Sequence, residues 1–298
     1  MTTTNRRLHL APATVAILVL ASVVSWRTEA FQTRSSTVTT AVTVRGRNGQ
    51  LVSNLTEQDF AITEGGRPQK ITRFTAERTP LSVAIVIDTS QSLRGEPMQV
   101  TRAAVRRFID VSLRPDDEVA LVSFNHVVSV VANWTTDRTR LRANLDALNP
   151  TGSTALYDAV FTTLPLFTRR SLQRAAMVVI SDGADSASNH TPTQIKRELN
   201  GTDLFVYWIA VDHAATRAST RINPFTIAEI AGQGNGYSEV IPGPERLDVA
   251  LTRVSDELNH QYTMSYEPST PANGRMHTVR VSVPKRDYVV RARRGVVR

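Results

Sequence analysis

The stretch LSVAIVIDTSQS, residues 81–92, decides the fold of this chain of 298 residues. Residues 81–87 form an almost unbroken apolar run, which is typical of a strand buried on both faces of a parallel sheet. The polar loop that follows places Asp88, Ser90 and Ser92 at alternate positions, so that their oxygen atoms can project towards one point. Ligands of open α/β sheets bind beyond the carboxyl ends of the strands, and this loop is therefore a candidate site.

Strand and helix patterns alternate from residue 81 to residue 258. Further apolar strand patterns occur at residues 119–124, 127–131, 175–180 and 204–211. Helical patterns occur at residues 98–113, 141–148, 156–167, 224–231 and 245–258, and a further short helix opens at Thr191-Pro192. This alternation predicts an α/β fold with a doubly wound sheet.

Short strands replace this alternation at both ends of the chain. On the N-terminal side, Asn48-Gly49 is a hairpin signal, and Gly65-Gly66 predicts a turn between strands at residues 60–62 and 71–74. On the C-terminal side, alternating strand patterns occur at residues 262–266, 278–283 and 288–292. Isolated strands need partners, so we expect these flanks to pair into a small β-sandwich, with the α/β domain inserted between them. The predicted boundaries are 31–79 for the N-terminal β segment, 80–260 for the α/β domain and 261–298 for the C-terminal β segment.

Residues 1–30 are predicted to be a signal peptide. Arg6 and Arg7 give a basic start, residues 8–24 are mostly apolar, and Ala30 ends a small-residue pattern that a signal peptidase reads. The alternative is an uncleaved membrane anchor, since the apolar run is near the lower length limit of a spanning helix. Cleavage removes three Arg and one Glu and takes the formal charge from +8 to +6. We therefore expect a bacterial protein that is exported to the periplasm, to the cell surface or into the medium.

The chain contains no cysteine, which excludes several classes of site. A disulfide framework, a thiolate nucleophile, an iron–sulfur cluster and a Cys-ligated zinc are all impossible. Any metal must be bound by oxygen atoms or by imidazole. The 41% of hydrophobic residues are sufficient for a large core, so wholesale disorder is not expected.

Two further segments offer oxygen ligands that can join the loop after residue 87. Thr154 lies in a Gly-Ser-Thr segment before a predicted helix, and Asp182 follows the apolar strand at residues 175–180. Asp88 and Asp182 can face each other across neighbouring strands. Two carboxylates with three hydroxyls form a hard-oxygen ligand set, which prefers Mg²⁺, Mn²⁺ or Ca²⁺ over zinc or copper. The alternative is that these side chains only cap helices and turns.

These candidate ligands resemble, in order and in strand context, the metal-ion-dependent adhesion site (MIDAS) of von Willebrand factor type A (VWFA) domains. The matching residues are Asp88, Ser90, Ser92, Thr154 and Asp182. The resemblance covers about residues 80–260 and implies a Rossmann-like sheet with the metal site at its upper edge. It also implies that the three hydroxyls bind the metal and that the two Asp bind it directly or through water. Gln91 and Ser153 stand where the family usually has Gly, but neither is a ligand position.

Similar motifs extend beyond the metal site. They are LTEQDF at residues 55–60, TALYDA at residues 154–159 and Gln261-Tyr262, and together they look like those of exported bacterial VWFA-related proteins. The resemblance implies cell adhesion or other protein binding through one Mg²⁺, with Mn²⁺ or Ca²⁺ as alternatives. An exposed Asp or Glu of a partner protein would complete the coordination of the ion. Export makes nucleic acid an unexpected partner, whereas contact with the envelope or an anionic cell surface is left open.

A metal-dependent hydrolase is the first alternative function. A serine nucleophile needs a base, and none of the histidines after the signal lies in a Gly-x-Ser-x-Gly elbow or another recognisable setting. They are His126, His190, His213, His260 and His277. A site rich in neutral hydroxyls also activates water poorly, so we do not expect an enzyme.

Binding of an anionic polysaccharide or lipid surface through the basic C-terminus is the second alternative. The densest basic cluster consists of Arg286, Arg291, Arg293, Arg294 and Arg298. The simpler interpretation of this cluster is a solvated strand face.

Overall fold

The structure is a computed structural model that describes residues 1–2, 37–212, 223–284 and 286–298. The chain divides into the units Met1–Arg34 and Ser35–Arg298, and every helix and strand described belongs to the second unit. The predicted signal peptide, apart from its first two residues, lies outside the described residues, as does His213. Among the described residues, no helix has the length and apolar character needed to cross a bilayer.

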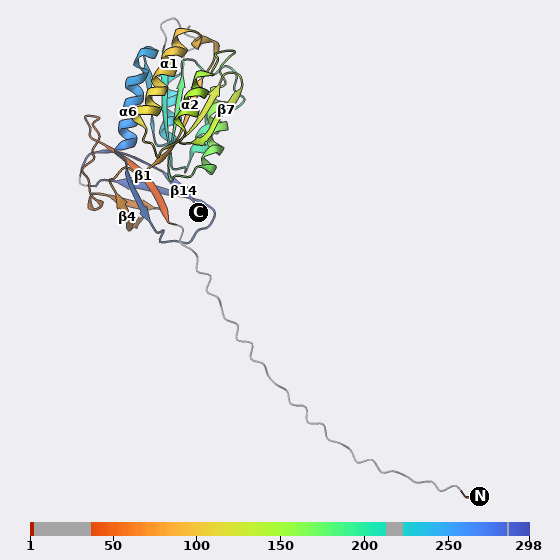
Figure 1. The fold of residues 1–298 in the computed structure, drawn as a ribbon. Coiled ribbons are helices and arrows are strands. Elements are labelled where there is room, and N and C mark those ends of the chain that lie inside the picture. Colours follow the sequence, from red (N-terminus) through yellow and green to blue (C-terminus); the bar gives the residue numbers. More distant parts are fainter. Residues whose placement is uncertain (3–36, 213–222, 285) are drawn as a thin grey trace. The chain divides into compact units, whose positions relative to one another are not determined.

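A six-stranded sheet forms the centre of the α/β part (Figure 1). Its strand order is β10-β9-β8-β5-β6-β7, with β7 antiparallel to β6 and all other neighbours parallel. The strands are β5 (Leu81–Asp88), β6 (Glu118–Phe124), β7 (Val128–Thr135), β8 (Arg174–Ser181), β9 (Leu204–Val211) and β10 (Tyr237–Ile241). Every residue of β5, β8 and β9 is buried, as expected for strands that helices cover on both faces.

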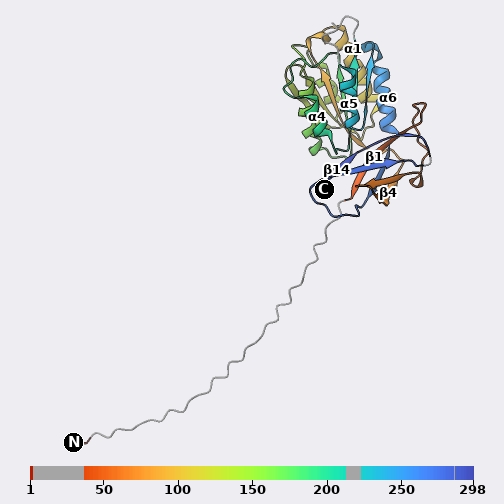
Figure 2. The same ribbon diagram turned by 180° about the vertical axis from the view of Figure 1, so that it is seen from behind.

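Helices pack on both faces of this sheet (Figures 1 and 2). One face, with Val83, Ile85 and Ile87, contacts α1, α2 and α6, and the other, with Ala84 and Val86, contacts α3, α4 and α5. The helices are α1 (Glu96–Arg107), α2 (Arg138–Asp146), α3 (Leu156–Thr163), α4 (Pro192–Leu199), α5 (Pro224–Gln233) and α6 (Leu247–Asn259). Single-turn and irregular helical segments are η1 (Glu57–Asp59), η2 (Gln91–Leu93), η3 (Phe108–Ser112), η4 (Leu164–Arg169) and η6 (Pro244–Arg246). The predicted doubly wound α/β fold is confirmed.

Two four-stranded antiparallel sheets accompany the α/β part. Their strand orders are β13-β1-β11-β4 and β14-β12-β2-β3. The strands are β1 (Val38–Arg45), β2 (Ala61–Glu64), β3 (Arg67–Gln69), β4 (Ile71–Thr75), β11 (Tyr262–Tyr266), β12 (Met276–Ser282), β13 (Val289–Ala292) and β14 (Gly295–Val297). Residues of both sheets, including Val42, Ile62, Met264 and Val281, share one hydrophobic cluster, so the sheets pack as a sandwich. Strand β1 pairs with β11 and β13, and β2 pairs with β12.

Strand pairing differs from the sequence prediction at one of the two glycine turns. Gly65-Gly66 joins β2 to β3, whereas the predicted partner β4 belongs to the other sheet and pairs with β11. At Asn48-Gly49 the chain reverses in a short hairpin, with an antiparallel bridge between Arg45 and Leu51 and a hydrogen bond from the N–H of Val52 to the carbonyl of Val44 at 2.9 Å. A turn sequence fixes where the chain reverses, but burial of the strand faces decides which strands pair.

Candidate functional site

The candidate site lies at the carboxyl ends of the neighbouring strands β5 and β8. Asp88 is the last residue of β5, and the parallel register places Ile87 opposite Ile180. Ser181 and Asp182 therefore follow directly beside Asp88. Asp88 is 0% exposed and Asp182 is 3% exposed, because both follow strands that are buried along their whole length.

Hydrogen bonds connect the loop after β5 with the loop after β8. Asp88 accepts from the N–H of Ser90 at 2.7 Å and from the hydroxyl of Ser181 at 2.5 Å. The hydroxyls of Ser90 and Ser92 lie 3.0 Å apart, and Ser92 Oγ donates to Asp182 Oδ1 at 3.0 Å. Four of the five candidate ligands from the sequence therefore lie in one connected network.

Thr154 lies on a third loop, which main-chain hydrogen bonds attach to the loop after β5. The N–H of Thr151 donates to the carbonyl of Thr89 at 2.8 Å, and the N–H of Gln91 donates to the carbonyl of Gly152 at 3.0 Å. Gly152 has a φ of +72°, a left-handed conformation that glycine adopts readily. Thr154 is 6% exposed. In the described part of the chain, no hydrogen bond joins its hydroxyl to the other four candidates.

The sequence reasoning missed supporting side chains on the loop after β8. Besides Ser181, Ser186 accepts from the N–H of Thr154 at 3.1 Å, and Asp185 accepts from the N–H of Leu156 at 2.9 Å. Leu156 opens α3, so Asp185 satisfies a free N–H group at the start of this helix. The polar run SDGADSAS at residues 181–188 was the sequence feature that could have indicated these contacts, because its hydroxyls and carboxylates can accept hydrogen bonds from free main-chain N–H groups.

The electrostatic environment of Asp88 is unusual. Burial raises the pKa of its carboxyl, and the charge of Asp182 raises it further. Hydrogen bonds from Ser181 and Ser90 lower the pKa but do not outweigh these two effects, so that the pKa of Asp88 is about 7 instead of 3.8. Its hydrogen-bond partners are hydroxyl and amide groups, with no Lys or Arg among the described residues. A buried carboxylate without a cationic partner is costly, so this arrangement of two Asp and several hydroxyls fits a divalent cation.

Hydroxyl groups would have to complete the coordination of such an ion. Among the described residues, no group of three or more His, Asp or Glu could hold a metal. The connected network supplies two carboxylates and the hydroxyls of Ser90 and Ser92, and Thr154 lies on the attached third loop. Hard cations with oxygen ligands accept such a mixed set.

Comparison with known proteins identifies the fold. The sequence profile of the von Willebrand factor type A domain matches residues 83–184. No curated protein sequence matches the chain significantly. Among solved structures, a von Willebrand factor type A protein from Catenulispora acidiphila is similar, with 15% identity and a TM-score of 0.54 over 80% of this chain and 73% of that chain.

Two other solved structures belong to fibre or matrix proteins. Proximal thread matrix protein 1 from the mussel byssus has 16% identity and a TM-score of 0.52, over 66% of this chain and 51% of that chain. The PilB minor pilin from Streptococcus sanguinis has 13% identity and a TM-score of 0.50, over 62% of this chain and 63% of that chain. The mussel protein has also been solved with a zinc-occupied MIDAS motif, at a TM-score of 0.49. At these identities the similarity establishes the fold alone.

Proposed function

Because this chain contains a von Willebrand factor type A domain, we propose that it is an exported interaction module that binds an acidic group of a partner protein through a divalent cation. One observation carries the proposal: the hydroxyl of Ser92 bridges Ser90 and Asp182 beside the buried carboxylate of Asp88. Side chains from two loops thus converge on one small, oxygen-rich region.

In this proposal, five side chains hold the cation. Ser90, Ser92 and Thr154 bind through their hydroxyls, and Asp88 and Asp182 bind directly or through water. When bound, the ion supplies a Lewis-acid position that accepts a carboxylate oxygen. Mg²⁺ is the proposed ion, with Mn²⁺ and Ca²⁺ as alternatives, because the ligands are all hard oxygen atoms. Two carboxylates only balance a divalent charge, so an Asp or Glu of a partner adds a favourable charge-assisted contact.

The surroundings of the site favour binding over catalysis. Among the described residues, no histidine forms a hydrogen bond with the hydroxyls of Ser90 and Ser92, so neither serine has an imidazole base in hydrogen-bonding contact. His190 instead contacts Asp158, with 2.6 Å between Nδ1 and Oδ1, and stacks on Phe161 with ring centroids 3.7 Å apart. The similar pilin and byssus matrix proteins also have fibre or matrix roles by name.

The proposal of export rests on the N-terminal sequence. Arg6-Arg7 and the apolar residues 8–24 have the character of a signal peptide or an anchor. In either case the domain acts outside the cytoplasm, where a cysteine-free protein is unaffected by an oxidising environment.

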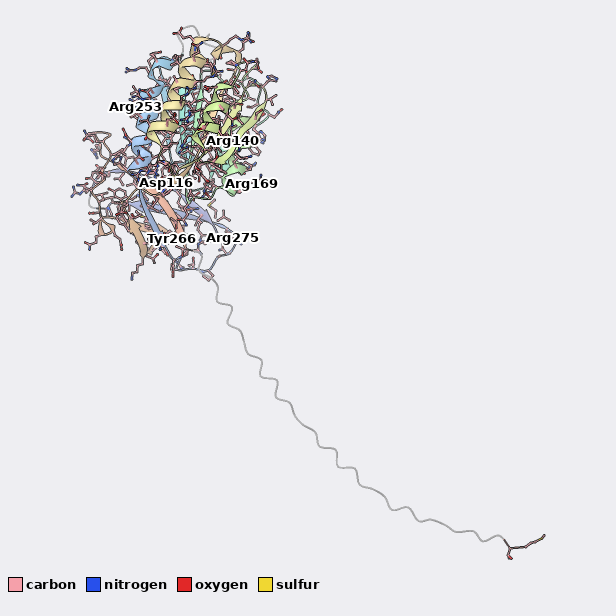
Figure 3. The ribbon with its side chains drawn as sticks, in the orientation of Figure 1. Asp116, Arg140, Arg169, Arg253, Tyr266 and Arg275 are labelled. Atoms are coloured by element: carbon pink, nitrogen blue, oxygen red, sulfur yellow. The ribbon has the colours of Figure 1, made fainter. Side chains whose placement is uncertain are left out.

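Metal titration tests the first half of the proposal. Calorimetric titration of the protein with Mg²⁺, Mn²⁺ and Ca²⁺ is expected to show a single site, and Asp88→Ala is expected to abolish it. Asp116→Ala is the matched control, because Asp116 is exposed, lies away from the site and makes no ion pair among the described residues (Figure 3). Saturable binding that survives in Asp88→Ala would contradict the proposed site.

Partner capture tests the second half. The immobilised protein is incubated with envelope extract in Mg²⁺ or in EDTA, with Asp88→Ala in parallel. A captured protein is expected to require both Mg²⁺ and Asp88, and to lose binding when one of its exposed Asp or Glu residues is changed to Asn or Gln. Binding that persists in EDTA, or that no acidic substitution in the partner weakens, would overturn the proposed mode of recognition.

A further inference from the structure

A cleft of about 410 Å³ lies between strands β12 and β13 of the sandwich and the turn that joins α5 to β10. Among the described residues, arginines supply all of its charged side chains, and neither Asp nor Glu lines it. The arginines are Arg280, Arg286, Arg291, Arg293 and Arg294. We name this feature the arginine cleft.

Three of these arginines have no acidic partner among the described residues. Arg280, Arg286 and Arg294 are exposed, and none of them forms an ion pair with a described residue. Arg286 lies over the ring of Tyr288, with its guanidinium carbon 6.0 Å from the ring centroid. No described carboxylate therefore neutralises their charges in an ion pair.

Arg293 is half-buried, and among the described residues its hydrogen bonds go to neutral groups, while the charges of Asp203 and Glu64 act on it from farther away. Its guanidinium donates to the carbonyls of Thr39 at 3.2 Å, Gly201 at 3.0 Å and Gly295 at 3.0 Å. Such contacts satisfy donors but do not cancel the charge. Arg293 also lines a neighbouring cavity together with Thr39 and Asp203, so its guanidinium is not counted towards the ligand-binding charge of the arginine cleft.

Arg291 is only partly compensated. It pairs with Glu257, which is fully buried and also pairs with Arg45 at 2.8 Å. One carboxylate thus serves two guanidinium groups, so this cluster keeps a net positive charge. Arg298, which the sequence grouped with these residues, differs: it pairs with Glu64 and donates to Thr270, so it has a structural role.

The arginine cleft is also remote from the candidate metal site along the sheet. The turn that lines it, residues 232–236, precedes β10 and so lies at the amino end of the parallel strands. The candidate metal site lies at their carboxyl ends. The two features can therefore be tested separately.

We propose that the arginine cleft binds a phosphate-bearing ligand. A phosphate monoester carries up to two negative charges on three terminal oxygen atoms, so several guanidinium groups can share it, whereas a carboxylate offers two oxygen atoms and one charge. The planar fork of Arg matches phosphate with two parallel hydrogen bonds. The volume of the cleft accommodates a phosphate together with part of the group that carries it.

Calorimetric titration of the whole chain with inorganic pyrophosphate tests the proposal. The buffer contains no divalent cation, so that the metal site does not contribute. Replacing Arg280, Arg286 and Arg294 together by Gln is expected to weaken binding at least tenfold. The matched control replaces Arg67, Arg140 and Arg169 by Gln, which removes the same charge from exposed, unpaired positions outside the cleft (Figure 3 labels Arg140 and Arg169).

Each outcome of the titration decides the proposal. Weakening in the cleft variant but not in the control supports it, whereas equal weakening in both, or no binding to the unmodified protein, overturns it. Lys at the same three cleft positions keeps the charge and is expected to restore part of the affinity. Citrate that binds as tightly as pyrophosphate overturns the assignment to phosphate. Thermal unfolding of each variant verifies that the fold is intact.

Vesicles distinguish the source of the phosphate. Phosphatidylcholine vesicles with and without phosphatidic acid are mixed with the protein and floated on a density gradient. Flotation that requires both phosphatidic acid and the three cleft arginines supports a lipid headgroup as the source. Pyrophosphate binding without flotation supports a soluble or polymer-borne phosphate. Flotation that is identical in the cleft variant and the control contradicts a role for the cleft at membranes.

Discussion

The hydroxyl of Ser92 donates to Oδ1 of Asp182 at 3.0 Å, which joins two loops that lie 90 residues apart in the sequence. Ser92 also contacts Ser90 at 3.0 Å, so it is the link between the loop after β5 and the loop after β8. A cation that binds here would exchange these hydrogen bonds for coordination by the same oxygen atoms. The existing bonds therefore pre-organise the ligands and reduce the cost of ordering them.

Ser92→Ala is expected to remove the response to Mg²⁺ while leaving the fold almost unchanged. The substitution deletes one proposed ligand and two partly buried hydrogen bonds, which costs the metal-free protein about 1–2 kcal/mol of unfolding free energy. Thermal unfolding with and without Mg²⁺ measures both effects. Ser129→Ala is the control, since Ser129 is exposed and lies on the edge strand β7, which β6 separates from β5. A normal Mg²⁺ response in Ser92→Ala would show that Ser92 is not a ligand.

Asp88→Asn is expected to stabilise the metal-free protein while abolishing cation binding. The folded-state pKa of Asp88 is about 7, above its ordinary 3.8, so the folded protein binds a proton more tightly than the unfolded chain does. The ionised carboxylate therefore reduces stability progressively as the pH rises from about 4 to 7. At pH 8 the neutral amide is expected to gain about 1–3 kcal/mol in denaturant unfolding, and the gain is expected to shrink towards pH 4. An equal effect at both pH values would contradict this origin.

The alternation of strands and helices was predictable because each pattern is local. A strand such as β5 is apolar along its length and a helix such as α1 repeats its apolar residues, whatever lies beside them. The edge strands β3, β10 and β14 were missed, because they are short, with three to five residues each, and form by adding to a neighbouring strand. Their sequences carry no independent signal, and only the assembled sheets reveal them.

The candidate site was predictable to a similar extent. Adjacency of Asp88 and Asp182 followed from two parallel strands that end at the same edge of the sheet. The hydrogen bond between Ser181 and Asp88 could not be predicted in this way, because it depends on which side chain points inwards at the end of the strand. The same holds for Arg298 in the basic cluster, whose partner Glu64 lies on a strand far away in the sequence.

Acid is expected to weaken a buried contact at the start of β6. Glu118 accepts from the hydroxyl of Ser82 at 2.6 Å and from the N–H and hydroxyl of Ser171 at 2.8 and 2.7 Å. Burial alone would raise its pKa, but these hydrogen bonds outweigh burial and lower the pKa below 4.5. The ionised carboxylate of Glu118 therefore contributes its full stabilisation above pH 4.5. This stabilisation is lost as the pH falls through the lowered pKa that Glu118 has in the folded state. Ser171→Ala should cost about 1–2 kcal/mol in urea unfolding at pH 7 and less at pH 3; a cost that does not depend on pH would contradict this account.

Glu257 on α6 is expected to be the most sensitive charged position in the described structure. Its carboxylate is fully buried and binds Arg45 at the end of β1, Arg291 on β13 and the hydroxyl of Tyr207 at 3.0 Å. It therefore connects the α/β part to two strands of the sandwich. Glu257→Gln keeps the shape but leaves two guanidinium groups without their counter-charge, which should cost about 3–5 kcal/mol.

Denaturant unfolding of Glu257→Gln measures this cost, and Glu239→Gln provides the comparison. Glu239 pairs with Arg253 at the surface, where the Arg side chain is 50% exposed, so its loss should cost less than about 1 kcal/mol. The two substitutions remove the same charge and differ mainly in burial. Limited proteolysis adds a local measure, since loosening of β13 should expose the C-terminal strands to cleavage in Glu257→Gln alone. Equal unfolding costs for the two variants would contradict this prediction. They would mean that water solvates Arg45 and Arg291 when Glu257 is neutral, and that the hydrophobic cluster stabilises the sandwich without this ion pair.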